Sequence, residues 1–147
     1  MCRLLPRLAA EGLRLQARRG LRSPEARRKG TASVAATDIG DARAASFADP
    51  GLSDRRVSGD LVAAMAGCRP QLMLDAAREI PRFDRPVLLV WGTECGFFPL
   101  AHAERLAADF PRATLITVPG ARTWVPVDNP AAVATALADF VPAAPVR

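Results

Sequence analysis

An unbroken apolar run constrains the fold of this chain more than any other feature. Residues 86–92 read Pro-Val-Leu-Leu-Val-Trp-Gly, so that β-branched and aromatic residues stand between a proline and a glycine. A strand with one face in water would alternate polar and apolar residues, whereas a strand covered by helices on both faces has no polar side. The run therefore predicts a buried parallel strand, and with it an α/β fold.

The residues that follow complete one strand–helix–strand unit. Pro99 opens a predicted helix, Pro111 ends it, and residues 114–118 form a second apolar strand. The connection in such a unit is right-handed, and ligands bind in the crevice beyond the carboxyl ends of the strands. The loops at 93–98 and 119–129 are therefore the places where we expect a site.

Two segments that include these loops carry a family pattern. Residues 83–99 read Phe-Asp-Arg-Pro-Val-Leu-Leu-Val-Trp-Gly-Thr-Glu-Cys-Gly-Phe-Phe-Pro, and residues 119–130 read Pro-Gly-Ala-Arg-Thr-Trp-Val-Pro-Val-Asp-Asn-Pro. Together they resemble the C-terminal part of an α/β-hydrolase. The resemblance implies a partial hydrolase fold, with the end of a cap followed by a short parallel sheet and flanking helices. The family activity that it implies is hydrolysis of small esters, epoxides or similar substrates.

The catalytic positions of that family are replaced in this chain. In the family the first loop carries the acid of a catalytic triad and the second loop carries its histidine; here the matching residues are Cys95 and Thr123. A threonine hydroxyl is not a base near neutral pH, and His102, the only histidine, falls on the helix between the strands. The chain also has no G-x-S-x-G nucleophile motif. We expect a truncated, triad-lacking relative that is inactive as this chain, and whether it is an enzyme stays open.

Cys95 could be either a simple replacement of the triad acid or a nucleophile. A thiolate is a strong nucleophile, but the neighbouring Glu94 is expected to raise the pKa of the thiol and so to disfavour this role. Arg122, beside the threonine, is a single cation with no second group to support an anion site. The aromatic residues of the loops are expected either to line a pocket for a small apolar substrate or to seal the end of the sheet: Trp91, Phe97, Phe98 and Trp124.

The basic residues of the chain are concentrated at its N-terminus. Residues 1–30 hold nine Arg or Lys and two Glu, although the net charge of the whole chain is only +5. Residues 3–19 are predicted to form an amphipathic basic helix. By the resemblance, this helix stands at the place of a hydrolase cap helix. Its Arg-rich composition also fits a targeting presequence or a nucleic-acid contact. The favoured interpretation is that its basic face simply lies in solvent. We therefore expect neither a nucleic acid nor a membrane as partner.

Composition divides the chain into three predicted segments: a basic arm and flexible linker (1–50), cap-like helices (51–85) and a C-terminal core segment (86–147). In the second segment one helix should be capped by Ser58 or Asp60 and end at Gly67, and another should start at Pro70. Their apolar residues are expected to pack in the core. A last helix should start at Pro130 with Asp128 or Asn129 as its cap. Its predicted sheet-facing residues are Val133, Ala134, Leu137, Phe140 and Val141.

The cysteines and the hydropathy limit the remaining classes. Three widely spaced cysteines fit neither a disulfide framework nor a zinc site, which favours a cytoplasmic protein without a metal or other cofactor. No apolar run approaches the length of a membrane-spanning helix. A two-stranded sheet would leave an edge exposed at 87–91 or 114–118. The alternative function is therefore a non-catalytic interaction module, or a homodimer, that pairs through such an edge.

Overall fold

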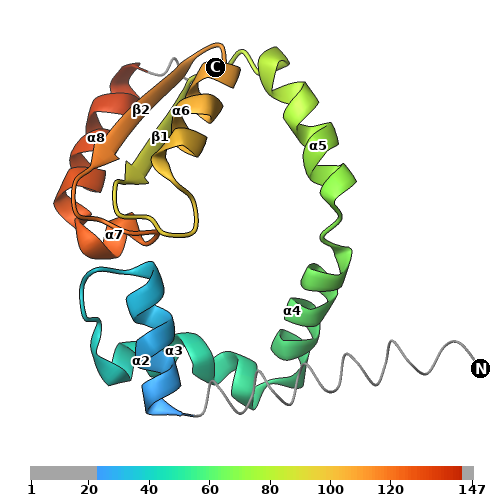
Figure 1. The fold of residues 1–147 in the computed structure, drawn as a ribbon, viewed down its shortest axis with the longest axis vertical. Helices are drawn as coiled ribbons and strands as arrows, with labels where there is room; N and C mark the ends of the chain where they lie inside the picture. The colour runs from blue at the N-terminus through green and yellow to red at the C-terminus, as the bar shows by residue number, and fades with distance from the viewer. Residues whose placement is uncertain (1–22, 144–147) are drawn as a thin grey trace, which may run out of the picture. The chain divides into compact units, whose positions relative to one another are not determined.

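The computed structural model describes residues 23–143, so the helix predicted at 3–19 lies outside it. The contacts of the chain divide into two compact units, which we call the helical unit (residues up to 31, and 39–72) and the sheet unit (32–38, and from 73 onward). The three-part division expected from composition stays a prediction. The described elements are α2 (Pro24–Val34), α3 (Gly40–Ser53), α4 (Arg55–Gly67), α5 (Pro70–Glu79), the 3-10 helix η1 (Ile80–Arg82), β1 (Val87–Gly92), α6 (Leu100–Asp109), β2 (Ala113–Val118), α7 (Val125–Asp128) and α8 (Pro130–Ala143) (Figure 1).

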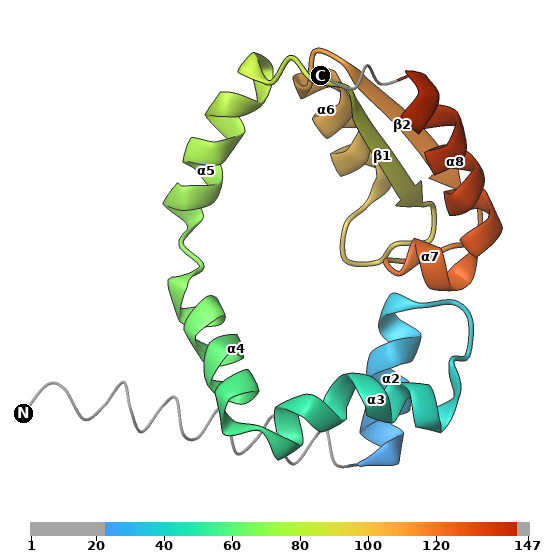
Figure 2. The same ribbon diagram turned by 180° about the vertical axis from the view of Figure 1, so that it is seen from behind.

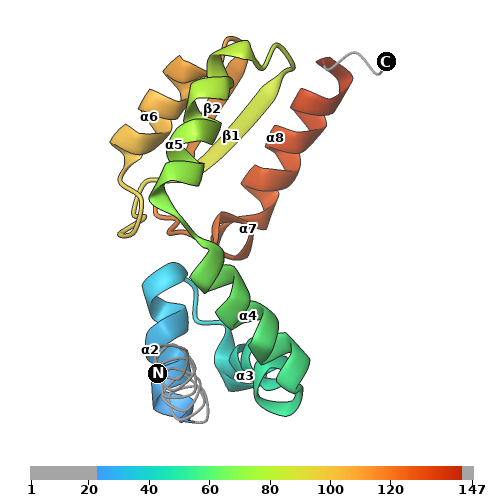
Figure 3. The same ribbon diagram turned by 90° about the vertical axis from the view of Figure 1, so that its right-hand side faces the viewer.

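The sheet unit contains the predicted strand–helix–strand arrangement. β1 and β2 pair in parallel, with Val87 opposite Ala113 and Gly92 opposite Val118, and their arrowheads point toward α7 (Figure 2). Helices α6 and α8 lie on opposite sides of the sheet (Figure 3). The predicted α/β fold, a short parallel sheet with flanking helices, is confirmed. β1 is less buried than predicted, because in the described chain each strand has only one neighbour.

The core of the sheet unit lies at the carboxyl end of the sheet. Val118, Ala121 and Val125 form its buried cluster, against which Val90 and Val133 pack. These three buried residues belong to the end of β2, to the loop that follows and to the start of α7. The contacts that form the core therefore also position the loops in which a site was predicted.

The start of α8 agrees with the sequence prediction, but its buried face differs from it. Asn129 caps the helix, since its Oδ1 accepts a hydrogen bond from the N–H of Ala132 at 3.0 Å. Of the residues predicted to pack on the sheet, Val133 packs against the core and Phe140 is half-buried, but Ala134, Leu137 and Val141 are exposed. Ala132 and Ala136 face the core in their place. α8 carries apolar residues around most of its circumference, so its spacing alone could not define the buried face.

The flexible linker predicted up to residue 50 is wrong for its described part, because α2 and α3 occupy most of it. Ala44 and Ala48, one helical turn apart on α3, are both buried. Ion pairs between the two helices join Arg27 to Asp49 at 3.7 Å and Arg28 to Asp41 at 3.0 Å. The described contacts of these helices thus involve small and charged residues, and composition alone does not distinguish such helices from a linker.

Helices α4 and α5 have the predicted end and start, at Gly67 and Pro70. The cap of α4 is Asp54, whose Oδ1 accepts from the N–H of Arg56 at 2.7 Å, so the caps predicted at 58 and 60 are wrong. Neither helix buries a residue, and the expected packing of their apolar positions is therefore wrong as well. The large exposed side chains are Leu61 and Met65 of α4 and Leu72, Met73 and Leu74 of α5. None of the helices within 23–143 combines the length and apolarity needed to cross a membrane.

Candidate functional site

Backbone hydrogen bonds join the two loops that follow the strands. The N–H of Thr93 donates to the carbonyl of Val118 at 3.1 Å, and the N–H of Glu94 donates to the carbonyl of Ala121 at 2.9 Å. Thr93 also accepts, through its Oγ1, from the N–H of Gly120 at 3.1 Å. These bonds continue the parallel pairing of the strands into the loops, so the two loops lie together at the carboxyl end of the sheet.

Glycines allow the backbones of these loops to approach closely. A Cβ atom on Gly92 would collide with the carbonyl oxygens of Ala121 and Arg122. Gly120 has a φ of +74°, a conformation that residues with a side chain rarely adopt, and it turns the second loop away from β2. Gly92, which ends the apolar run, is therefore required because the loop at 119–129 leaves no space for a side chain there.

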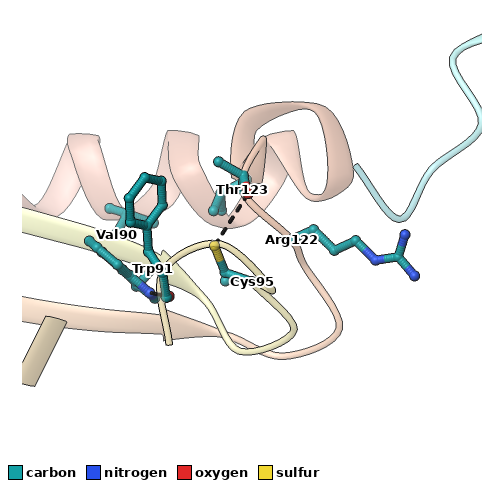
Figure 4. A pocket seen from close by; sticks show the side chains of 8 residues that line it. Val90, Trp91, Cys95, Arg122 and Thr123 are labelled. Carbon is teal, nitrogen blue, oxygen red and sulfur yellow. Dashed lines mark hydrogen bonds between the residues drawn. The ribbon is translucent and has the colours of Figure 1, made fainter. Parts of the chain in front are cut away.

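The residues at the two replaced triad positions are in contact. The Sγ of Cys95 and the Oγ1 of Thr123 lie 3.2 Å apart in a hydrogen bond, and both side chains are half-buried (Figure 4). Burial raises the pKa of the thiol, but hydrogen bonds from the Thr123 hydroxyl and from the backbone of Phe98 and Phe97 outweigh it, so that the pKa is lowered. The expectation that Glu94 raises the pKa of Cys95 is wrong, because hydrogen bonds to the thiolate decide the direction.

A small hollow of about 150 Å³ opens beside this pair. Its walls are mainly apolar and aromatic, and include Val90, Trp91, Phe98 and Val125 beside the thiol and the hydroxyl. Pockets for drug-sized ligands usually measure roughly 300–1,000 Å³. The hollow therefore has room for a molecule of only a few heavy atoms.

Two of the four aromatic residues predicted to line a pocket do so. Trp91 and Phe98 line the hollow; the indole N–H of Trp91 donates to the carbonyl of Phe98 at 2.9 Å, and their rings meet edge to face with centroids 6.4 Å apart. Phe97 and Trp124 are not among the residues of its wall, and Phe97 is 58% exposed. That these side chains bind a substrate stays a prediction.

Asp128 is the residue of this region that the sequence analysis placed in the wrong role. Its carboxylate does not cap α8: Oδ1 accepts from the N–H groups of Ala36 and Thr37, each at 2.8 Å, and Oδ2 accepts from the N–H of Arg122 at 2.7 Å. Partial burial raises the pKa of Asp128, but these backbone donors outweigh it and the pKa is lowered. No local pattern signals these bonds, because the partners at 36 and 37 are far away in sequence.

The guanidinium of Arg122 donates hydrogen bonds to backbone carbonyls. Its Nη1 donates to the carbonyl of Ala32 and, at 3.5 Å, to that of Ala35. Figure 4 shows its side chain directed away from Cys95 and Thr123. The guanidinium is therefore held by protein carbonyls, and nothing in this arrangement supports the anion site that was considered for it.

The described residues bring a thiol and a hydroxyl together, without an imidazole between them. His102 lies on α6, the helix on which it was predicted, and is exposed, whereas the neighbouring Ala103 is the buried residue of that helix. Within the described residues no group of three or more His, Cys, Asp or Glu side chains could hold a metal ion. The chemistry that the site offers is that of a hydrogen-bonded thiol next to a small apolar hollow.

Comparison with known proteins gives partial likenesses to hydrolases. No family model matches the chain. "Haloalkane dehalogenase 2" of Mycobacterium tuberculosis is 32% identical over 91 residues, which make up 60% of this chain and 32% of the dehalogenase. "Uncharacterized hydrolase YugF" of Bacillus subtilis is 30% identical over 63 residues, 43% of this chain and 23% of that protein. The chain thus spans a third or less of these relatives. The likenesses are consistent with a relationship to the α/β-hydrolases at the level of the superfamily only.

Proposed function

We propose that this chain is a hydrolase-like protein whose hollow at the end of the sheet binds a small apolar molecule and does not hydrolyse it through a triad. The observation that carries the proposal is the contact of 3.2 Å between Cys95 and Thr123. By the resemblance to α/β-hydrolases, these residues stand where the acid and the histidine of a triad would meet. A thiol and a hydroxyl have taken their places.

The chemistry of this pair argues against hydrolysis by the family route. A triad needs a base that accepts the proton of the nucleophile near neutral pH and a carboxylate that orients this base. The Thr123 hydroxyl is not such a base, and Cys95 has no imidazole to orient. An ester or an epoxide, which the family resemblance implies, or a haloalkane, which the name of the dehalogenase indicates, would bind here without being turned over.

The walls and the volume of the hollow define the proposed ligand. Trp91, Phe98 and Val125 offer apolar surface, and a volume of about 150 Å³ suits a molecule with a few carbon atoms. Titration of the tryptophan emission with 1-chlorobutane and with ethyl acetate tests this. We expect saturable quenching in the wild type and in Trp124→Phe, and none in Trp91→Phe. Quenching that rises linearly without saturation would speak against a binding site.

The absence of turnover is tested on the purified chain. Release of nitrophenol from p-nitrophenyl acetate and of chloride from 1-chlorobutane should both equal the rates in buffer at neutral pH. Cys95→Ala is the decisive variant, and Cys68→Ala, which changes an exposed cysteine, is its matched control. Turnover that is lost only in Cys95→Ala would make Cys95 a nucleophile, and turnover that survives in both variants would reveal another one; either result contradicts the proposal.

The alternative of a non-catalytic module that pairs through a sheet edge stays a prediction. Its one support is that in the described chain each of the two strands has a free outer edge, and free edges of apolar strands attract other strands. Size-exclusion chromatography with light scattering over a tenfold range of concentration tests it. A monomer at every concentration would contradict homodimer formation.

A further inference from the structure

We infer that Asp128 is a positioning residue for the Cys95–Thr123 pair, because it clamps residues 32–37 onto the loop that carries Thr123 and so controls the reactivity of the Cys95 thiol. We call residues 32–37 the strap. The inference rests on the proposed function only in taking this pair as the site. It does not depend on whether the hollow binds a ligand.

Hydrogen bonds run in both directions between the strap and the loop. The Asp128 carboxylate takes two N–H groups of the strap on Oδ1 and the N–H of Arg122 on Oδ2, at 2.7 to 2.8 Å. The N–H of Trp124 donates to the carbonyl of Val34 at 2.7 Å, and the Arg122 guanidinium donates to the carbonyls of Ala32 and Ala35. The Asp128 carboxylate therefore joins the strap to the loop, and the hydrogen bonds of Arg122 and Trp124 to strap carbonyls strengthen this link.

These bonds fix the backbone on both sides of Thr123. The N–H before it, that of Arg122, is held by Asp128, and the N–H after it, that of Trp124, is held by the strap. Each residue has only two soft backbone dihedrals, so two anchored neighbours leave the direction of the Thr123 Cβ little freedom. The β-branched side chain is itself restricted at χ1. The hydroxyl is thereby kept at 3.2 Å from the thiol.

The strap is a firm anchor because it is packed as well as hydrogen-bonded. Ala35 is only 1% exposed, so its methyl group is buried. Loss of the carboxylate would leave three backbone N–H groups without this acceptor, one of them on the residue next to Thr123. The loop would then move, and the Cys95 thiolate would lose the hydroxyl that stabilises it.

The test is the alkylation of Cys95 by iodoacetamide as a function of pH, followed by peptide mass spectrometry on the full chain. Exposed Cys68 in the same sample is the internal reference. Thr123→Val should move the midpoint of the Cys95 profile to higher pH and slow alkylation at neutral pH about two- to threefold, since the lost hydrogen bond is partly offset by a more nucleophilic thiolate. Asp128→Ala should reproduce most of this change. Asp139→Asn, which removes an exposed carboxylate of α8, should not.

A double variant separates positioning from a general loss of structure. If Asp128 acts through Thr123, Asp128→Ala adds little to the shift already present in Thr123→Val. Fully additive shifts, an unmoved midpoint in Asp128→Ala, or an unmoved midpoint in Thr123→Val would each overturn the inference. Faster alkylation at every pH with the same midpoint would mean only greater exposure of the thiol, and would overturn it as well. Should Asp128→Ala fail to fold by circular dichroism, the near-isosteric Asp128→Asn carries the same comparison.

Discussion

The sheet unit and the helical unit bury very different side chains. In the sheet unit α6, the sheet and α8 stack so that Val118 and Val125 have neighbours on several sides, whereas the described part of the helical unit buries only Ala44 and Ala48. The buried cluster of the sheet unit is also the support of the candidate site. The comparison teaches that the stability of this chain and the geometry of its site depend on the same few residues.

The largest effect should come from the point where the loops approach β1 most closely. Gly92→Ala places a methyl group against two backbone carbonyls that cannot move without breaking the joined loops, and we expect it to lower the free energy of unfolding by about 3 kcal/mol. Urea denaturation measures this. Gly96→Ala is the matched control, because a Cβ at that position meets no atom within 4 Å. Equal midpoints for the two variants would mean that the loops do not pack as described.

Truncation inside the buried cluster should rank second. Val118 is 1% exposed at the end of β2, and Val118→Ala should reduce the free energy of unfolding by about 2 kcal/mol, through lost burial and the space left behind. The helical unit offers the contrasting variant Val57→Ala, at an exposed position of α4. If both variants cost the same in urea denaturation, the contrast between the units would be lost.

Asp128 should contribute less to the free energy of unfolding, and its contribution should depend on pH. Backbone donors hold its pKa below that of the unfolded chain, so the carboxylate stabilises the fold at neutral pH and this contribution disappears as the pH falls through the folded-state pKa. Asp128→Asn should therefore cost about 1 kcal/mol at pH 7. This cost should begin to fall at about pH 4, the ordinary pKa range of an aspartate, and should vanish only below the lower folded-state pKa. Urea midpoints of both proteins at pH 7 and pH 3 measure the difference. A constant difference across this range would show that the charge is not involved.

The smallest effect is expected on the exposed face of α4. Leu61 is 57% exposed, and Leu61→Gln should change the free energy of unfolding by no more than about 0.5 kcal/mol, because little apolar contact is lost. The same substitution at Leu115, a partly buried residue of β2, is the comparison within the sheet unit. A cost above about 1 kcal/mol for Leu61→Gln would show that this side chain is covered in solution.

The sequence was sufficient to predict the elements whose signals are local. The β-branched run at 86–92, with its proline and glycine, predicts β1 and its end, and the parallel pairing with β2 places the two loops together. The contact between Cys95 and Thr123 could be anticipated because the resemblance puts both residues at facing positions.

The remaining features depend on contacts that are distant in sequence or that have no compositional signature. The strap is bound to Asp128 through backbone N–H groups, which any residue except proline offers, so no residue type marks it. Ion pairs join α2 to α3, and the buried residues of α3 are alanines. Charged residues and alanines are also typical of a linker, so composition does not reveal these helices. The direction of the pKa shift of Cys95 follows from donors at 97, 98 and 123 and could not be read from its neighbour at 94.

The hydrogen bond between Ala36 and Asp128 joins residues that are 92 positions apart in the chain, whereas β1 and β2 pair across a single helix. Closing a longer loop costs more chain entropy, and contacts distant in sequence tend to form late. We therefore expect the sheet to assemble before the strap is in place, so that the strap completes the site late in folding. A rise in the alkylation rate of the Cys95 thiol at neutral pH, late in refolding, would therefore mark the step in which the strap binds.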